Sequence, residues 1–301
     1  MFKSICIIGC GLIGSSILRN VKKKKLSKKV TVFDKSTFVR RYLKRKRLCN
    51  NVSTNLKKSV LGADLVIIAS PLSSYNGILK TIKDSLKVGA ILTDTGSVKR
   101  EINDVANKLK IDNVSWIASH PIAGTEESGP QAGDINLFKG RWCVLSPSKN
   151  SKKNDLIKLE KFWMKLGSKV KIMSFSEHDY ILSLTSHLPH AIAYNLVITA
   201  IQNDKKSKKE IVKYSAGGLR DFTRIASSNP IMWKDIFLDN SDNMVKILNL
   251  FTKNINKFKN AIRKGDGKKL LNIFKLTKTV REDIIRAGQD TDKPDFGRKK
   301  S

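Results

Sequence analysis

Gly9-Cys10-Gly11-Leu12-Ile13-Gly14 is the stretch of sequence that decides the fold of this 301-residue chain. The apolar run 3–8 before it is typical of a strand, and residues 15–25 after it read as a helix. A Gly-x-Gly-x-x-Gly sequence in this position is typical of a dinucleotide-binding fold, in which the first helical N–H groups meet the pyrophosphate. We therefore expect the cofactor to contact Gly9, Gly11, Leu12, Ile13 and Gly14.

The next apolar run, residues 30–33, ends at an acidic residue, Asp34. A carboxylate about 20 residues beyond the fingerprint meets the ribose 2′-hydroxyl of NAD and repels the 2′-phosphate of NADP. Lys35, Arg40 and Arg41 follow closely and soften that discrimination. NAD is the expected cofactor and NADP the less favoured one. The plain alternative is a strand, turn and helix with a solvated Asp34.

The rest of the chain divides into an alternating part and a helical part. Strand-type runs occupy residues 64–70, 90–94, 114–118, 142–145 and 170–173, and the period becomes helical from about residue 177. We predict an α/β fold, with an N-terminal doubly wound Rossmann domain over residues 1–173. An all-helical domain for the substrate and for dimerisation should follow over residues 174–301.

Several polar or glycine-rich segments come directly after predicted strands. Because the carboxyl ends of parallel strands form the ligand crevice of a doubly wound sheet, these segments should line one site. Ser70 and Pro71 are expected beside the cofactor, Ser97 beside the nicotinamide, and His120 at the same edge.

The chain has only four histidines, and three of them stand in two short motifs, Ser119-His120-Pro121 and residues 186–190. Histidine is the side chain best suited to move a proton near neutral pH. His187 and His190 are three residues apart and share a helix face, although they could equally be satisfied core histidines. His178 has no motif around it and is predicted to be a surface helix residue.

Composition narrows the class of protein. The net charge of +32 is spread over both halves, with 27 Lys and Arg against 10 acids in residues 1–150 and 31 against 16 in residues 151–301. Such a diffuse field attracts small anions but does not predict specific nucleic-acid binding. No apolar run is long enough for a membrane span, and no signal peptide is recognisable. The four cysteines lack metal-ligand spacing, so we expect no metal and a reduced, cytoplasmic protein.

Four blocks of sequence resemble the prephenate and arogenate (cyclohexadienyl) dehydrogenases of tyrosine biosynthesis. They are residues 9–14, residues 94–99 (Asp-Thr-Gly-Ser-Val-Lys), residues 120–126 (His-Pro-Ile-Ala-Gly-Thr-Glu) and residues 217–226 (Gly-Gly-Leu-Arg-Asp-Phe-Thr-Arg-Ile-Ala). The first block is common to many dehydrogenases, whereas the other three in this order are specific. The ending, residues 287–298, is similar to the cyclohexadienyl branch.

The resemblance implies NAD-dependent oxidative decarboxylation of prephenate or arogenate, to 4-hydroxyphenylpyruvate or tyrosine. It implies that His120 accepts the proton of the 4-hydroxyl, that Ser97 orients the nicotinamide and the hydroxyl, and that Arg224 binds a carboxylate of a dicarboxylate substrate. By the same resemblance the pocket is lined or closed by Thr125, Glu126, His187, His190, Arg220 and Trp233. Arg220 could instead only pair with Asp221, and Trp233 could be simple packing.

Two other functions share part of this pattern. A β-hydroxyacid dehydrogenase has a similar domain order but relies on a lysine in its second domain, and a non-catalytic NAD-binding regulator would have no use for His120, Ser97 and Arg224 together. Apolar residues at helical spacing in 244–251 and 270–274 exceed what one small domain needs internally. We therefore expect a homodimer through residues after 174.

Overall fold

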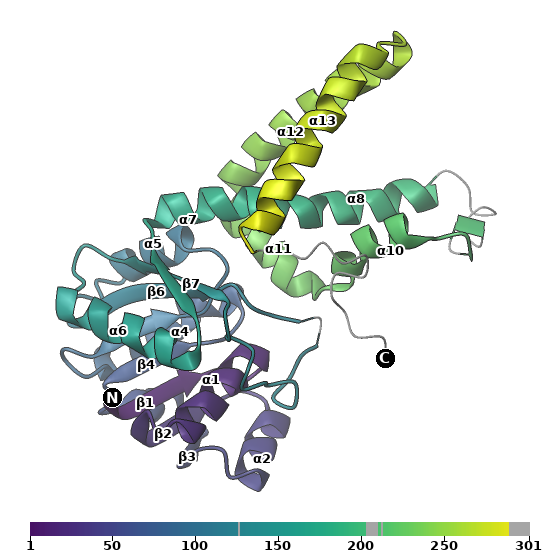
Figure 1. Ribbon diagram of the computed structural model, residues 1–301. Coiled ribbons are helices and arrows are strands. Elements are labelled where there is room, and N and C mark those ends of the chain that lie inside the picture. Colours follow the sequence, from purple (N-terminus) through teal and green to yellow (C-terminus); the bar gives the residue numbers. More distant parts are fainter. Residues whose placement is uncertain (126, 203–209, 212, 289–301) are drawn as a thin grey trace. The chain divides into compact units, whose positions relative to one another are not determined.

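The computed structural model describes residues 1–125, 127–202, 210–211 and 213–288 (Figure 1). The chain forms two compact units, Met1–Met244 and Val245–Ser301. Glu126 and most of the ending 287–298, which the sequence analysis singled out, lie outside the described residues.

The first unit is built around an eight-stranded sheet of order β3-β2-β1-β4-β5-β6-β7-β8. The strands from β1 to β6 pair in parallel, β7 is antiparallel to β6, and β8 is parallel to β7. The short edge strand β3 and the reversal at β7 are features that the sequence did not predict. The strands are β1 (Phe2–Ile8), β2 (Ser27–Phe33), β3 (Asn51–Ser53), β4 (Leu65–Ile68), β5 (Ile91–Asp94), β6 (Ser115–Pro121), β7 (Trp142–Pro147) and β8 (Lys169–Ile172).

Helices cover both faces of this sheet, so the prediction of a doubly wound domain is confirmed (Figure 1). Alternate side chains of β1 point to opposite faces: Ile5 and Ile7 belong to one buried cluster, and Cys6 and Ile8 to another. The first cluster includes residues of α1 (Leu12–Lys23), α2 (Thr37–Arg45) and α6 (Lys153–Leu166). The second includes residues of α3 (Leu56–Val60), α4 (Tyr75–Ile82) and α5 (Arg100–Lys108).

After Ile172 the described residues contain helices and no strand, as predicted for the second part of the chain. Ser174 caps the first of these helices, because its side chain accepts a hydrogen bond from the Glu177 N–H. The turn before Pro189 is a π-helix, η3 (Ser183–His187), at the place where the proline removes a backbone donor. The helices are α7 (Phe175–Leu182), α8 (Leu188–Gln202), α10 (Gly217–Thr223), α11 (Pro230–Asp239), α12 (Ser241–Arg263) and α13 (Gly267–Arg286), with a 3₁₀ turn η4 (Arg224–Ser227).

The second unit consists of most of α12 together with α13. Their rings meet at Phe258 and Phe274, whose centroids are 6.2 Å apart. Large apolar side chains on both helices are nevertheless exposed, among them Leu250, Leu276 and Val280. Among the described helices, none combines the length and the apolar character that crossing a membrane requires.

Candidate active site

The loops after β1, β4 and β5 lie at one edge of the sheet because these strands are parallel and in register. Ile8 pairs with both Phe33 and Ile68, and Ile68 pairs with Asp94. The backbone N–H of Ala69 donates to the Ile8 carbonyl at 2.7 Å, and that of Thr95 donates to the Ile68 carbonyl at 3.0 Å. The segments predicted to share a crevice are therefore brought together.

The glycine loop has the shape that a dinucleotide requires. Gly9 has a φ of +88°, and a Cβ there would lie 2.6 Å from the Ala69 carbonyl oxygen. A Cβ on Gly14 would lie 2.2 Å from the Gly9 carbonyl oxygen, whereas one on Gly11 would meet nothing within 4 Å. The first and third glycines thus close the turn onto the sheet and the helix, and the second leaves open space at the start of α1. The loop fits a pyrophosphate at Gly11, Leu12 and Ile13.

Asp34 lies directly after β2, where the ribose of the cofactor would be held. Its carboxylate accepts hydrogen bonds from the Cys10 N–H and the Ser36 N–H, both at 2.8 Å, so it is tied to the glycine loop. Arg40 donates from its guanidinium to the backbone carbonyls of Asp34 and Lys35, at 2.7 and 2.8 Å. These contacts engage Arg40, one of the three cations, with Lys35 and Arg41, that the sequence analysis expects to soften the preference for NAD.

Ser70 and Ser97 follow the neighbouring strands β4 and β5. The Ser70 hydroxyl donates to the Ile8 carbonyl at 3.3 Å, and the exposed Pro71 is the residue before the 3₁₀ turn η1 (Leu72–Ser74). Ser97 is half-buried, and its hydroxyl makes no hydrogen bond to the described residues. Its side chain is available to a ligand in the crevice.

A buried ion pair braces the turn that carries Ser97. Lys99 Nζ lies 2.5 Å from Asp94 Oδ2, and both side chains are fully buried. The same carboxylate accepts the Gly96 N–H at 2.8 Å and, through Oδ1, the Ser119 N–H at 3.1 Å. Burial lowers the pKa of Lys99, and the Asp94 charge opposes that effect. Asp94 thus links the Ser97 turn to the strand that ends at His120.

His120 is the next-to-last residue of β6 and is 8% exposed. Its Nδ1 lies 2.8 Å from Nε2 of His178. Burial lowers the pKa of His120 well below its usual value, and the nearby His178 and Lys99 lower it further. The ring of His120 is therefore neutral and keeps a lone pair on one nitrogen, which is the form of histidine that a general base requires.

The prediction that His178 is a surface residue is wrong. His178 is fully buried, and its Nδ1 lies 2.7 Å from Asp179 Oδ1. The reason is that α7 packs against α5 and β7 and buries the face that carries His178 and Leu182. The four-residue spacing of those two side chains was the sequence signal for that face.

His187 and His190 lie on one helix face, as their spacing predicts, and both meet Trp233 of α11. The ring of His190 stacks on Trp233 with centroids 3.6 Å apart, and the ring of His187 lies 6.0 Å from it. His187 Nδ1 is 3.2 Å from Asn240 Nδ2, but its buried Nε2 has no partner among the described residues. Burial lowers the pKa of His187 to about 4.

The remaining predicted residues lie on more exposed backbone. Arg224 begins η4, which packs against α8, and its charge adds to burial in lowering the pKa of His190. Arg220 is mostly exposed and pairs with Asp221 at 3.3 Å, as the alternative interpretation expects. Thr125 is exposed, and its hydroxyl accepts a hydrogen bond from the Glu127 N–H at 3.3 Å.

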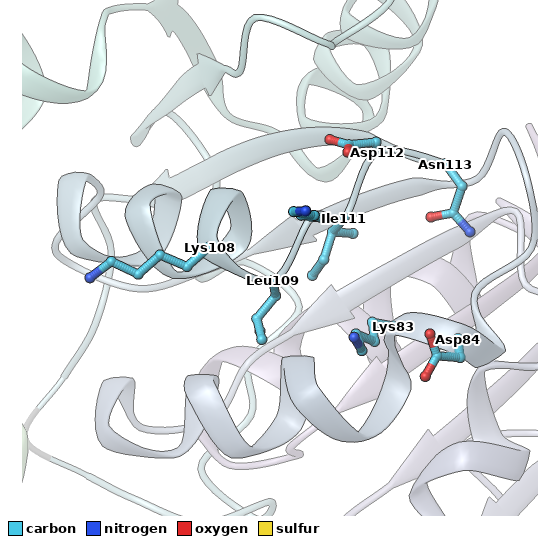
Figure 2. A pocket seen from close by; sticks show the side chains of 8 residues that line it. Lys83, Asp84, Lys108, Leu109, Ile111, Asp112 and Asn113 are labelled. Carbon is cyan, nitrogen blue, oxygen red and sulfur yellow. The ribbon is translucent and has the colours of Figure 1, made fainter.

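A surface hollow of about 420 Å³ lies elsewhere on the first unit (Figure 2). Its lining comes from the turn after α4 and from the segment between α5 and β6, which stand at the amino ends of β5 and β6. His120 and Ser97 stand at the carboxyl ends of the same strands, so this hollow is separate from the crevice. It is lined by Lys83, Asp84, Lys108, Leu109, Lys110, Ile111, Asp112 and Asn113.

Comparisons with known proteins agree with this geometry. Residues 17–172 match the nucleotide-binding domain of prephenate dehydrogenase, and residues 174–276 match the prephenate dehydrogenase dimerization domain. The cyclohexadienyl dehydrogenase of Zymomonas mobilis is 37% identical over 281 residues, which are 93% of this chain and 96% of that protein. The prephenate dehydrogenase of Lactococcus lactis is 34% identical over 284 residues, 93% of this chain and 77% of that protein.

Solved structures show the same relationship. The crystal structure of prephenate dehydrogenase from Aquifex aeolicus in complex with hydroxyphenyl propionate and NAD+ has a TM-score of 0.87 and 32% identity, and covers 94% of this chain and 99% of that one. Synechocystis arogenate dehydrogenase has a TM-score of 0.80 at 22% identity, over 93% of this chain and 99% of that one, and so shares the fold.

The Rossmann sheet, the open glycine loop and a buried histidine at the crevice define a dinucleotide-binding oxidoreductase. Within that class, the chain belongs to the prephenate dehydrogenase family.

Proposed function

We propose that this chain is an NAD-dependent dehydrogenase that oxidatively decarboxylates prephenate, arogenate or both. The observation that carries the proposal is the position of His120, a buried and neutral histidine near the carboxyl end of β6, on the strand beside the one that leads into the Ser97 turn. The relatives named as cyclohexadienyl and prephenate dehydrogenases, which align with nearly the whole chain, support it.

The reaction requires a base, an orienting donor and a cation. The substrate ring carries a hydroxyl at C4 and a carboxylate that leaves as CO₂ as the ring becomes aromatic. A bound NAD supplies the acceptor for the hydride of C4. His120 takes the hydroxyl proton on its ring nitrogen and returns it to the ring oxygen when CO₂ leaves and the ring becomes aromatic. The Ser97 hydroxyl orients the substrate hydroxyl and the nicotinamide. The products are NADH, CO₂ and either 4-hydroxyphenylpyruvate or tyrosine.

Recognition of the remaining substrate groups falls to the helical part of the first unit. Arg224 would bind a carboxylate with its planar guanidinium, which can make two parallel charge-assisted bonds. We propose that His187 and the stacked pair of His190 and Trp233 complete the pocket. The buried Nε2 of His187, which has no partner among the described residues, supports this. Thr125, Glu126 and Arg220 are proposed to line or close the pocket.

NAD is preferred over NADP in this proposal. Asp34 presents a carboxylate at the ribose position, and Arg40 is engaged with backbone carbonyls. We further propose a homodimer, supported by the match to a dimerization domain. The four cysteines are free, which fits a reducing compartment such as the cytoplasm.

Turnover tests the proposal. Purified protein with NAD should raise NADH absorbance when prephenate or arogenate is added, with 4-hydroxyphenylpyruvate or tyrosine identified by chromatography. His120→Asn should lower kcat roughly 10²–10⁴-fold while the Kd for NAD is unchanged, because the amide keeps a hydrogen bond but cannot act as a base.

Other outcomes would favour the other functions. Turnover of a β-hydroxy acid in place of both substrates would indicate a β-hydroxyacid dehydrogenase. Tight NAD binding without turnover of any of them would indicate a regulator.

A further inference from the structure

A chain of three buried side chains leads from the crevice into the helical part of the first unit. His120 Nδ1 lies 2.8 Å from His178 Nε2, and His178 Nδ1 lies 2.7 Å from Asp179 Oδ1. His178 is fully buried, Asp179 is 1% exposed and His120 is 8% exposed. Water therefore competes little for these hydrogen bonds.

The Asp179 carboxylate fixes the donor and the acceptor in both hydrogen bonds that link His120, His178 and Asp179. An ionised carboxylate only accepts, so His178 must carry its proton on Nδ1 and donate it to Asp179. Burial lowers the pKa of His178, which keeps that ring neutral and leaves a lone pair on Nε2. His120 must then donate from Nδ1, and its own lone pair stands on Nε2.

Asp179 also holds the backbone next to Ser97. Its Oδ1 accepts the Lys99 N–H and its Oδ2 accepts the Arg100 N–H, both at 2.9 Å. Asn240 donates from Nδ2 to the backbone carbonyl of Asp179 at 2.9 Å. One carboxylate therefore ties the turn after β5 to the histidine pair.

We propose that His178 and Asp179 are positioning residues, which hold His120 in the tautomer whose Nε2 accepts the substrate proton and keep it in register with the Ser97 turn. This inference rests on the proposed function, because it gives His120 the role of the base. A carboxylate that orients a histidine base in this way is a common arrangement in hydrolases. Here a second histidine stands between the carboxylate and the base.

The groups around His178 keep its imidazole neutral, as the proposed positioning role requires. The charged or titratable groups near it are His120 on β6, Asp94 and Lys99 on β5 and its turn, Asp179 on α7 and His187 in η3. The Asp179 and Asp94 charges raise the pKa of His178 and the Lys99 charge lowers it, while burial has the largest effect.

Two substitutions of His178 separate positioning from simple packing. His178→Gln offers an amide oxygen to His120 and an amide N–H to Asp179, so it can preserve the direction of the chain. His178→Phe fills the space but offers His120 no acceptor. We expect His178→Phe to lower kcat on the order of 10²–10⁴-fold, with little change in KM or in the Kd for NAD. His178→Gln should recover at least tenfold of that loss.

The result that overturns the proposal is a kcat for His178→Phe within threefold of wild type. An equal loss of kcat in both variants, in proportion to their loss of melting temperature, also overturns it, because both would then be packing defects.

The tautomer can be read without turnover. Long-range ¹H–¹⁵N spectra of the ¹⁵N-histidine protein contain only four rings, and His120→Asn identifies the signal of His120. We expect a protonated Nδ1 and an unprotonated Nε2 on His120 of the wild type, and a mixture in His178→Phe. A wild-type His120 protonated on Nε2 overturns the proposal even if the enzyme is active. If neither prephenate nor arogenate is turned over, the proposed function fails while this measurement still decides the tautomer.

Discussion

At the scale of single residues, all four histidines of the chain lie in one region of the first unit and all have lowered pKa values. His120 and His178 share a hydrogen bond, and His187 and His190 both contact Trp233. Burial is the largest cause of the lowered pKa in each of them. The four imidazoles are therefore neutral near neutral pH, and their resistance to protonation in the folded chain affects stability as well as catalysis.

The stability of the protein should fall in mild acid because of His187. Its pKa is about 4 in the folded chain against 6.5 for the free side chain, so below pH 6.5 the unfolded chain binds a proton that the folded chain refuses. The free energy of unfolding therefore decreases as the pH falls from 6.5 toward 4. For this residue the loss between pH 7 and pH 5 is about 2 kcal/mol.

His187→Asn isolates that contribution, because the amide can keep the hydrogen bond to Asn240 but does not titrate. Urea unfolding of both proteins at pH 7 and pH 5 should show the wild type losing about 2 kcal/mol more than the variant. The comparison at each pH cancels Asp239, whose pKa burial raises to about 6 and which acts in the opposite direction. Equal losses in the two proteins would show that His187 titrates normally in the fold.

Arg224 should contribute to binding more than to chemistry. If it binds a substrate carboxylate in both the ground state and the transition state, Arg224→Ala raises KM roughly 30- to several-thousand-fold with a smaller fall in kcat. Arg224→Lys should recover only part of the affinity, since an ammonium cannot make the paired bonds of a guanidinium. Steady-state kinetics and a thermal melt on one preparation make the measurement. A lowered melting temperature with a normal KM would instead identify Arg224 as a brace of the helical part.

At the scale of elements, the three glycines of the loop between β1 and α1 have different surroundings and therefore different roles. Gly9 and Gly14 pack against backbone, whereas Gly11 borders open space. Gly9 and Gly14 are therefore needed for the fold, and Gly11 is needed for the ligand.

Alanine at Gly14 should therefore lower the stability of the fold, whereas alanine at Gly11 should lower the affinity for NAD. Gly14→Ala places a methyl group 2.2 Å from the Gly9 carbonyl oxygen and should cost roughly 2 kcal/mol or more of stability. Gly11→Ala should change stability by only about 0.5 kcal/mol, yet weaken NAD binding at least about tenfold by filling the space for the pyrophosphate. Chemical denaturation and calorimetric titration with NAD measure the two effects. NAD affinity unchanged in a folded Gly11→Ala protein would contradict the assignment of this loop.

At the scale of the whole molecule, the second unit has an apolar surface that would be exposed to water if the protein were a monomer. Leu276 is 66% exposed and Val280 is 50% exposed, and they stand four residues apart on one face of α13. Exposed apolar faces of this kind indicate a protein interface.

We expect a dimer in light scattering at micromolar concentration. The double variant Leu276→Glu/Val280→Glu should shift it toward monomer, because charges would have to be buried in the interface. Lys278→Glu, which points to the opposite side of the same helix, is the control and should leave the dimer intact. A wild-type monomer, or a dimer that the double variant does not weaken, would place the contact elsewhere or remove it.

The sequence by itself determined the order of the elements and the approximate positions of every strand except β3. Hydrophobic runs, the glycine fingerprint and the change of period near residue 177 are local signals, and local signals fix strands, turns and helices. His120 and Ser97 could be predicted as site candidates because His120 is the next-to-last residue of β6 and Ser97 stands three residues after β5. The carboxyl ends of neighbouring parallel strands meet at one edge of the sheet.

Only the tertiary structure decided what stands behind His120. His178 and Asp179 come from a helix 58 residues further along the chain, and no short-range pattern connects them to β6. The buried ion pair of Lys99 and Asp94 could not be predicted from the sequence either, since a lysine ordinarily indicates an exposed side chain. The burial of these groups depends on how the helices pack against the sheet, and that packing is a property of the folded chain as a whole.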